Sequence, residues 1–107
     1  MKQPWQPATA DLNLVDVLSA LADPTRLALV ARLAAQGSQN CNAINNDVEV
    51  HKTTMSHHYR VLREAGLTDT TVQGRERWID LRRIDLDARF PGLIDAVLTP
   101  LRTPHQS

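Results

Sequence analysis

The chain has 107 residues, with twelve Lys and Arg against twelve Asp and Glu, and a single cysteine. This length allows one domain with a modest core and excludes a catalytic domain joined to a separate regulatory one. A single cysteine excludes an intramolecular disulfide and favours a reducing compartment. The sequence has neither a secretory leader nor a run of about 18 apolar residues, so we expect a cytoplasmic protein with no membrane partner.

The N-terminal third of the chain, up to about residue 37, predicts an arm followed by two helices. Residues 1–10 contain two prolines and few apolar groups, which predicts a flexible N-terminal arm. Asp23-Pro24 is typical of a helix start, with Asp as the cap and Pro in the first turn, and this second helix should end near Gly37. A first helix is predicted from residue 11, because apolar side chains recur at helical spacing at Leu12, Val15, Leu18 and Ala22.

Residues 51–67 predict one amphipathic helix that ends at Gly66, where glycine adopts the left-handed conformation without a steric penalty. Its core-facing side should consist of Met55, Tyr59, Leu62 and Ala65. Its outward side should present Thr53, Ser56, His57 and Arg60, which are spaced i, i+3, i+4 and i+7. Hydroxyl, imidazole and guanidinium groups suit the base edges and phosphates of a DNA major groove, although a merely solvated helix face would have the same pattern.

A short helix over residues 40–47 and a turn at 48–50 precede this long helix, and together they predict a helix-turn-helix. The period then changes to two, which predicts a β-hairpin from strands at 67–72 and 76–82. Residues 51–83 hold seven Lys and Arg against four Asp and Glu, so this region is basic although the chain is neutral. A basic hairpin after a recognition helix favours a wing along DNA, although a plain structural hairpin remains an alternative.

The C-terminal part predicts a broken turn at 85–91 and a closing helix over about 91–101. We therefore expect a mainly α fold with a small β-hairpin, a winged helix-turn-helix of about five helices and a two-stranded wing. The domain should span residues 11–99, with a tail at 100–107. The expected DNA-binding residues are Lys52, Thr53, Thr54, Ser56, His57, Arg60, Arg63, Gly74, Arg75 and Arg77.

The sequence resembles the ArsR (SmtB) family of bacterial repressors over roughly residues 11–99. The resemblance rests on Ala22-Asp-Pro-Thr-Arg-Leu27, on Met55-Ser-His-His-Tyr-Arg-Val-Leu-Arg-Glu-Ala-Gly-Leu67 and on Gly74-Arg-Glu-Arg-Trp78. It implies a winged-helix dimer that binds a palindromic operator and is released by an inducer. It also implies a dimer interface built from the first and last helices, which here corresponds to Leu12, Val15, Leu18, Leu93, Ile94 and Val97.

The chain departs from the metal sensors of that family. The positions of their Cys-x-Cys pair hold Asn40 and Asn42, and a lone Cys41 between them cannot supply three or four metal ligands. We therefore expect no metal site and no cofactor. A small buried hydrophobe is the expected role of Cys41, and a redox-responsive regulator that uses this thiol is the alternative.

We interpret the chain as a homodimeric transcriptional repressor that binds double-stranded DNA and responds to an unknown inducer, if one exists. A winged-helix module that binds protein is an alternative, but the outward helix face is neither acidic nor apolar. An enzyme is not expected, because Ser56 and His57 are adjacent on a helix and point about 100° apart, too far to act as nucleophile and base.

Overall fold

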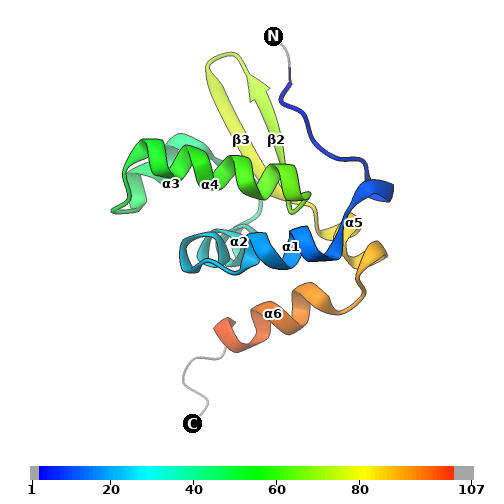
Figure 1. The fold of residues 1–107 in the computed structure, drawn as a ribbon. Coiled ribbons are helices and arrows are strands. Elements are labelled where there is room, and N and C mark those ends of the chain that lie inside the picture. The colour runs from blue at the N-terminus through cyan, green and yellow to red at the C-terminus, as the bar shows by residue number, and fades with distance from the viewer. Residues whose placement is uncertain (1–2, 103–107) are drawn as a thin grey trace.

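The computed structural model describes residues 3–102. Within them the chain forms a short 3₁₀ helix, six α-helices and a three-stranded sheet (Figure 1). The expected winged helix-turn-helix is confirmed, with six helices instead of about five and with a third, short strand. In chain order the elements are η1 (Thr9–Asp11), α1 (Leu14–Leu21), α2 (Pro24–Gln36), β1 (Gln39–Asn40), α3 (Cys41–Asp47), α4 (Lys52–Ala65), β2 (Thr68–Gln73), β3 (Glu76–Leu81), α5 (Arg83–Arg89) and α6 (Leu93–Arg102).

Side-chain caps fix where the first two α-helices begin. The side chain of Asn13 accepts a hydrogen bond from the backbone N–H of Asp16 at 3.1 Å, so α1 begins at the following residue. The predicted start at residue 11 is therefore too early, since residues 9–11 form a separate 3₁₀ turn. Asp23 accepts a hydrogen bond from the N–H of Arg26 at 3.0 Å, with Pro24 in the first turn, as expected for α2.

The long helix α4 ends at a glycine that the packing also requires. Gly66 has a φ of 87°, and the N–H of Leu67 donates to the carbonyl of Leu62 at 3.0 Å, which closes the helix as predicted. A Cβ atom on Gly66 would lie 2.0 Å from Cδ2 of Leu12. The absence of a side chain therefore lets the segment before α1 pack against the end of α4.

The hairpin of β2 and β3 has an antiparallel register that runs from Thr68 opposite Leu81 to Gln73 opposite Glu76. Its two-residue turn contains Gly74 at a φ of 63°, as hairpin turns favour. The strand order is β1-β3-β2, because Gln39 and Asn40 pair with β3. The expected two-stranded wing is confirmed as β2 and β3, the short β1 extends the sheet on the other side of β3, and β2 remains an edge strand.

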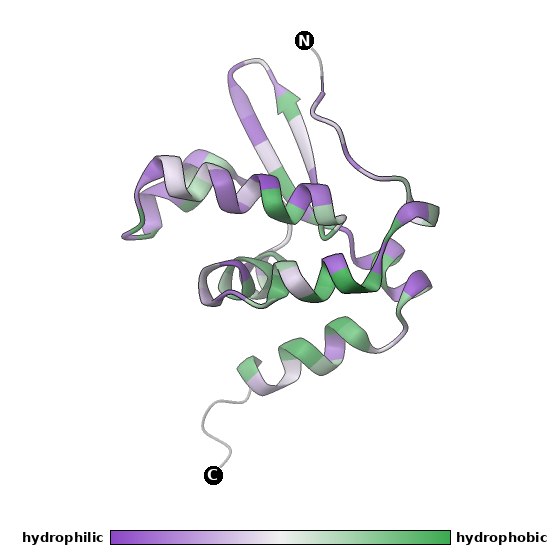
Figure 2. Ribbon diagram, viewed as in Figure 1, coloured by the Kyte–Doolittle hydropathy of each residue, from purple (hydrophilic) through white to green (hydrophobic). Residues whose placement is uncertain are grey.

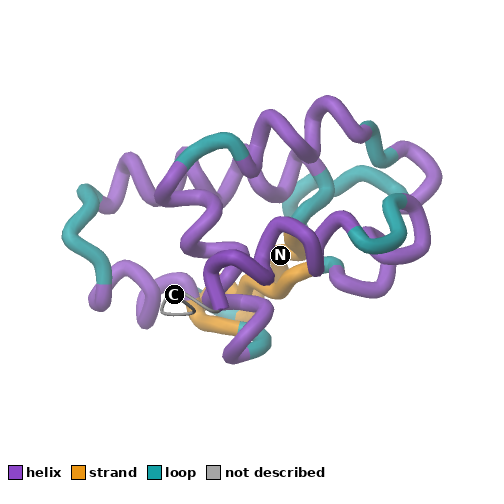
Figure 3. The backbone as a smooth tube through the Cα atoms, turned by 90° about the horizontal axis from the view of Figure 1, so that it is seen from below, coloured by secondary structure: helices purple, strands orange, loops and turns teal. Residues whose placement is uncertain are grey.

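The core lies between the helices and the base of the hairpin. Figure 2 shows hydrophobic residues concentrated in α1, α2 and α6, and hydrophilic residues in α4 and the outer part of the hairpin. Seen from below, the strands lie together in one region, and the helices and their connecting loops surround them (Figure 3). Almost fully buried side chains include Val17, Val30, Leu33, Ile44, Met55, Leu62, Leu67, Ile79, Leu86, Ile94 and Leu98.

Residues 83–89 form helix α5, where the sequence predicts a broken turn at 85–91. The helix begins after Arg82, whose buried guanidinium donates through Nε to Asp85 at 3.0 Å and through Nη1 to the carbonyl of Pro7 at 2.7 Å. Arg83 pairs with Asp87 along the same helix. These polar contacts stabilise a short helix that carries almost no apolar periodicity. The expected tail at 100–107 is also shifted, because α6 continues to residue 102, and residues 103–107 lie outside the described part of the chain.

The N-terminal residues are docked on the domain, contrary to the expected flexible arm. The side-chain amide of Gln3 accepts from the backbone N–H of Val72 at 2.7 Å and donates to its carbonyl at 3.1 Å. The side chain of Gln6 accepts from the N–H of Thr70. These backbone groups belong to the free edge of β2, so glutamine side chains replace the missing neighbour strand. Residues 1 and 2 of the expected arm lie outside the described residues.

The six residues expected at a dimer interface divide into two groups. Leu12 and Ile94 belong to the core of the single chain, since they are 3% and 0% exposed, so this part of the expectation is corrected. Val15 and Leu18 are exposed, and Leu93 and Val97 are partly buried. Leu14 and Leu101 add further exposed apolar surface on the same two helices. None of the helices described between residues 3 and 102 is both long and apolar enough to cross a membrane.

Candidate nucleic-acid interface

The outward face of α4 is the first part of the candidate interface. Met55, Tyr59, Leu62 and Ala65 are buried, as the helical pattern predicts, and the opposite face is left free of packing. His57 and Arg60 are neighbours there, with Nδ1 and Nη2 3.4 Å apart. The four side chains expected to contact base edges are all exposed: Thr53, Ser56, His57 and Arg60.

The first turn of α4 adds a basic group and free backbone donors. The ring nitrogen Nδ1 of His51 accepts from the N–H of Thr53 at 3.2 Å and so caps the helix. Lys52 and Thr54 are exposed beside this cap. A helix N-terminus with a lysine at its first position is a favourable place for a phosphate group.

The hairpin tip is the second part. Gly74, Arg75 and Arg77 are exposed, and neither arginine forms an ion pair with any residue in the range 3–102. With no ion pair inside that range, both guanidinium groups are available to an external anion.

Arg63, near the end of α4, is only partly exposed and donates through Nε to the carbonyl of Trp5 at 3.1 Å. Burial lowers the pKa of its guanidinium, the neighbouring Glu64 opposes this effect, and the positive charges of Arg77 and Arg60 lower the pKa further. Arg63 is therefore close enough to the hairpin for the charge of Arg77 to lower its pKa.

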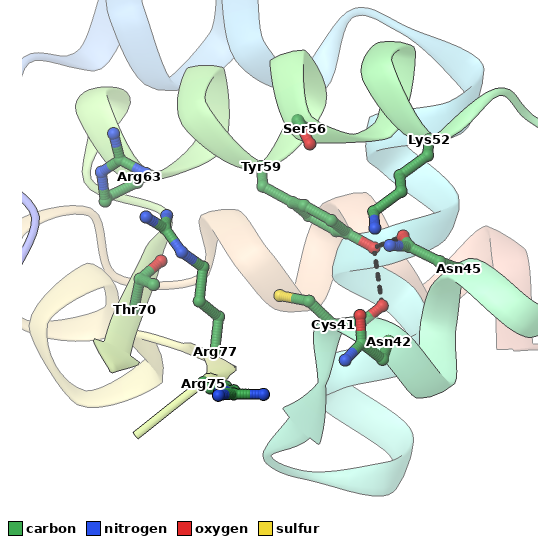
Figure 4. A pocket seen from close by; sticks show the side chains of 10 residues that line it. All are labelled: Cys41, Asn42, Asn45, Lys52, Ser56, Tyr59, Arg63, Thr70, Arg75 and Arg77. Atoms are coloured by element: carbon green, nitrogen blue, oxygen red, sulfur yellow. Dashed lines mark hydrogen bonds between the residues drawn. The ribbon is translucent and has the colours of Figure 1, made fainter. Parts of the chain in front are cut away.

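The structure brings four of the predicted cations around one pocket, a convergence that the sequence does not predict. Lys52 and Arg63 approach it from α4, and Arg75 and Arg77 approach it from the hairpin (Figure 4). The pocket has a volume of about 400 Å³. Polar groups of α3, α4 and β2 complete its wall, namely Asn42, Asn45, Ser56 and Thr70. The one available signal is the spacing of Lys52, Ser56 and Arg63, which places them along one flank of α4.

Cys41 and Tyr59 form the inner side of this pocket. Burial raises the pKa of the Cys41 thiol to about 11, although the charge of Arg77 opposes the shift. Burial also raises the pKa of Tyr59, whose hydroxyl donates to Oδ1 of Asn45 at 2.6 Å. A thiol that stays protonated at neutral pH is a weak nucleophile and a weak metal ligand, which disfavours the redox alternative.

His58, which the sequence does not single out, is buried. Its Nδ1 lies 3.3 Å from Nη1 of Arg26, and burial lowers its pKa, although Asp23 opposes this shift. The contact joins α4 to α2, so His58 supports the position of α4. Within the described residues, no group of three or more His, Cys, Asp or Glu is placed to hold a metal ion.

Comparisons with known proteins agree with this geometry. Residues 21–71 match a family model described as a helix-turn-helix domain. The chain is 33% identical over 82 residues to YceK of Bacillus subtilis strain 168, an HTH-type transcriptional regulator, covering 76% of this chain and 82% of that protein. A solved ArsR family transcriptional regulator aligns with a TM-score of 0.65 and 26% identity over 88% of this chain and 97% of that one. The transcriptional repressor BigR from Xylella fastidiosa aligns with a TM-score of 0.63 and 26% identity over 80% of this chain and 83% of that one.

Proposed function

The chain belongs to the ArsR family of helix-turn-helix transcriptional regulators, and from that premise we propose that it is a homodimeric repressor of a palindromic operator. The observation that carries the proposal is the polar, exposed face of α4 beside a hairpin whose arginines have no partner in residues 3–102. The repressor role is supported by the similarity to BigR, which is a transcriptional repressor. A regulator of this kind acts beside the genome in the cytoplasm.

Sequence is read by the outward face of α4. Thr53, Ser56, His57 and Arg60 are short or flexible enough to approach base edges when the helix lies in a major groove. Arg60 can contact guanine, and the hydroxyls can donate to or accept from either base of a pair. The contact between His57 and Arg60 restricts both side chains before DNA binds, which lowers the entropy lost in the complex.

Affinity comes from the groups around this face. We assign the phosphate contacts to three residues of α4 and three of the hairpin: Lys52, Thr54, Arg63, Gly74, Arg75 and Arg77. All are exposed except Arg63, which is partly exposed. Such contacts release counterions and attract any duplex, so they supply affinity without selecting a sequence. The exposed Gly74 allows the backbone at the hairpin tip to approach a phosphate closely.

Dimerisation is proposed through α1 and α6. Leu14, Val15 and Leu18 leave an exposed apolar stripe on α1, and Leu101 extends the partly buried Leu93 and Val97 on α6. Covering such an apolar stripe with a second copy of the chain is favourable, because a twofold contact buries the same surface on both chains. A twofold dimer would place the two α4 helices about 34 Å apart, in successive major grooves.

The proposal is tested by selecting duplexes from a random library with the full-length protein. We expect an inverted repeat with half-sites about 10 bp apart, bound by two chains and lost steeply as salt rises. Recovery of no enriched sequence, with duplex binding no stronger than to random DNA, would contradict the proposal.

A further inference from the structure

The pocket between α3, α4 and the hairpin contains positive charge that its own walls do not balance. Lys52, Arg63, Arg75 and Arg77 line it, and no described carboxylate lines it with them. None of these four side chains forms an ion pair within residues 3–102. Like charges held around a partly enclosed space repel each other, and an anion placed among them removes that repulsion.

The charge at Arg63 shows the effect of this crowding. Its guanidinium is partly buried, and its pKa is lowered first by burial and further by the charges of Arg77 and Arg60, although Glu64 acts in the opposite direction. The domain therefore holds a cation here at a cost that a bound anion would offset.

Thr70 supplies an independent indication of a ligand. It lines the same pocket from β2, it is only 4% exposed, and its hydroxyl has no hydrogen-bond partner among the described residues. Nearly all buried hydroxyl groups in proteins have a partner, so this unpaired donor requires an explanation. Figure 4 shows Thr70 on the same side of the pocket as Arg63 and Arg77. Less than 1 Å² of its hydroxyl oxygen is exposed, so the hydroxyl donates to an anion held by the guanidinium groups after a small shift of the side chains that cover it.

The neutral part of the wall consists of donors as well. The hydroxyl of Tyr59 donates to Oδ1 of Asn45, so the amide nitrogen of Asn45 keeps its own protons for another acceptor. Ser56 adds a hydroxyl from α4. A pocket with guanidinium, ammonium, amide and hydroxyl donors selects an acceptor-rich group such as an oxyanion.

We propose that this pocket binds a small phosphate-type oxyanion in the DNA-free protein, and that its occupancy lowers the affinity for DNA. A volume of about 400 Å³ lies in the range of small-molecule sites, so a phosphorylated small molecule also fits. The competition with DNA rests on the proposed function, because Lys52, Arg75 and Arg77 are assigned to the duplex backbone as well. The anion would therefore act as an inducer that occupies Lys52, Arg75 and Arg77, together with Ser56 at the edge of the reading face.

The first test uses inorganic phosphate and pyrophosphate as probes. Each is titrated into the DNA-free, full-length protein, with chloride adjusted to hold ionic strength constant, and backbone amide NMR shifts are recorded. We expect saturable shifts centred on Ser56, Thr70 and Arg77, and an affinity about tenfold lower for Thr70→Val. Thr71→Val is the matched control, because Thr71 is exposed and points to the other face of β2, and its affinity should be unchanged. Shifts that do not saturate, or that are equal in Thr70→Val and the wild type, would overturn the proposal.

The second test separates a free anion from a DNA phosphate. Affinity for the selected duplex is measured with phosphate or chloride as the anion, at equal ionic strength. We expect phosphate to weaken binding by the wild type and to have little effect on Thr70→Val. Saturable phosphate binding without this loss would overturn the regulatory half of the proposal. Weaker duplex binding by Thr70→Val, with no binding of free phosphate, would assign the pocket to the DNA backbone instead. If the wild type binds phosphate but does not prefer the selected duplex to random DNA, the proposed function is rejected and the anion site remains supported.

Discussion

Substituting Gly66 by alanine should destabilise the domain through two separable effects. The first is backbone strain, because Gly66 has a φ of 87°, and a left-handed residue with a Cβ costs about 1–2 kcal/mol. The second is a collision, since the new Cβ would lie 2.0 Å from Cδ2 of Leu12. Leu12 is only 3% exposed, so it cannot move freely, and overpacking of this kind costs about 1–3 kcal/mol. We expect a total loss of about 2–5 kcal/mol.

The collision can be isolated with a double-mutant cycle. Leu12→Ala removes the Cδ2 atom and costs about 2–5 kcal/mol on its own as a cavity. Adding Gly66→Ala in that background should cost only the strain, so the double variant should be more stable than additivity predicts by about 1–3 kcal/mol.

Urea unfolding followed by far-UV circular dichroism measures each member of the cycle at one fixed protein concentration, because a dimer's stability depends on concentration. With a slope of about 2 kcal/mol per molar urea, the middle of the usual range, Gly66→Ala should lower the midpoint by roughly 1–2.5 M. Strictly additive losses would refute the claim that Gly66 and Leu12 are in contact at the end of α4.

Three further predictions concern the arm, the dimer and the thiol. Gln6→Ala should increase hydrogen exchange at the Thr70 amide, which the Gln6 side chain covers, and an unchanged rate would show that the arm does not protect β2. If the proposed dimer forms through α1, Val15→Asp should give a species of about 12 kDa by light scattering and weaken binding to the selected duplex, because Val15 is 71% exposed in the single chain. Asp16→Asn, on the same helix, is the control and should leave both unchanged. Cys41 should react with a thiol reagent at pH 7.5 about 100-fold more slowly than an exposed cysteine, because burial raises its pKa to about 11. The reaction rate should rise as the pH approaches that value. A rate equal to that of the urea-unfolded chain would contradict this expectation.

Local signals in the sequence were sufficient to predict the elements that position the interface. Asp23-Pro24 and Gly66 identify a helix start and a helix end by backbone chemistry alone, and both are confirmed. The buried and exposed faces of α4 follow from helical periodicity, because a helix that packs on a core needs one apolar side.

Features that depend on distant contacts could not be predicted in the same way. The N-terminal arm docks through Gln3 and Gln6, whose partners on β2 lie 69 and 64 residues away. Helix α5 is stabilised by ion pairs of Arg82 and Arg83 and has no apolar pattern to reveal it. Each is a consequence of tertiary structure, which sequence periodicity does not contain.

The same limit explains the errors in the candidate sites. Periodicity shows that Leu12 and Ile94 are apolar, but it does not show whether they face the core of their own chain or a partner. The sequence predicts the cations as separate contacts, whereas the fold gathers four of them around one pocket. The burial of Thr70 beside them follows from strand pairing and could not be anticipated from its type.

One titration series distinguishes sequence reading by α4 from backbone binding by the hairpin. Arg60→Ala and Arg77→Ala are compared by fluorescence anisotropy on the selected duplex and on a random duplex, at several salt concentrations. Arg60→Ala should cost about 1–3 kcal/mol on the selected duplex and much less on the random one. Arg77→Ala should weaken both duplexes similarly and reduce the salt slope by roughly one. Equal losses on both duplexes with the same salt slope for the two variants would contradict this division of roles.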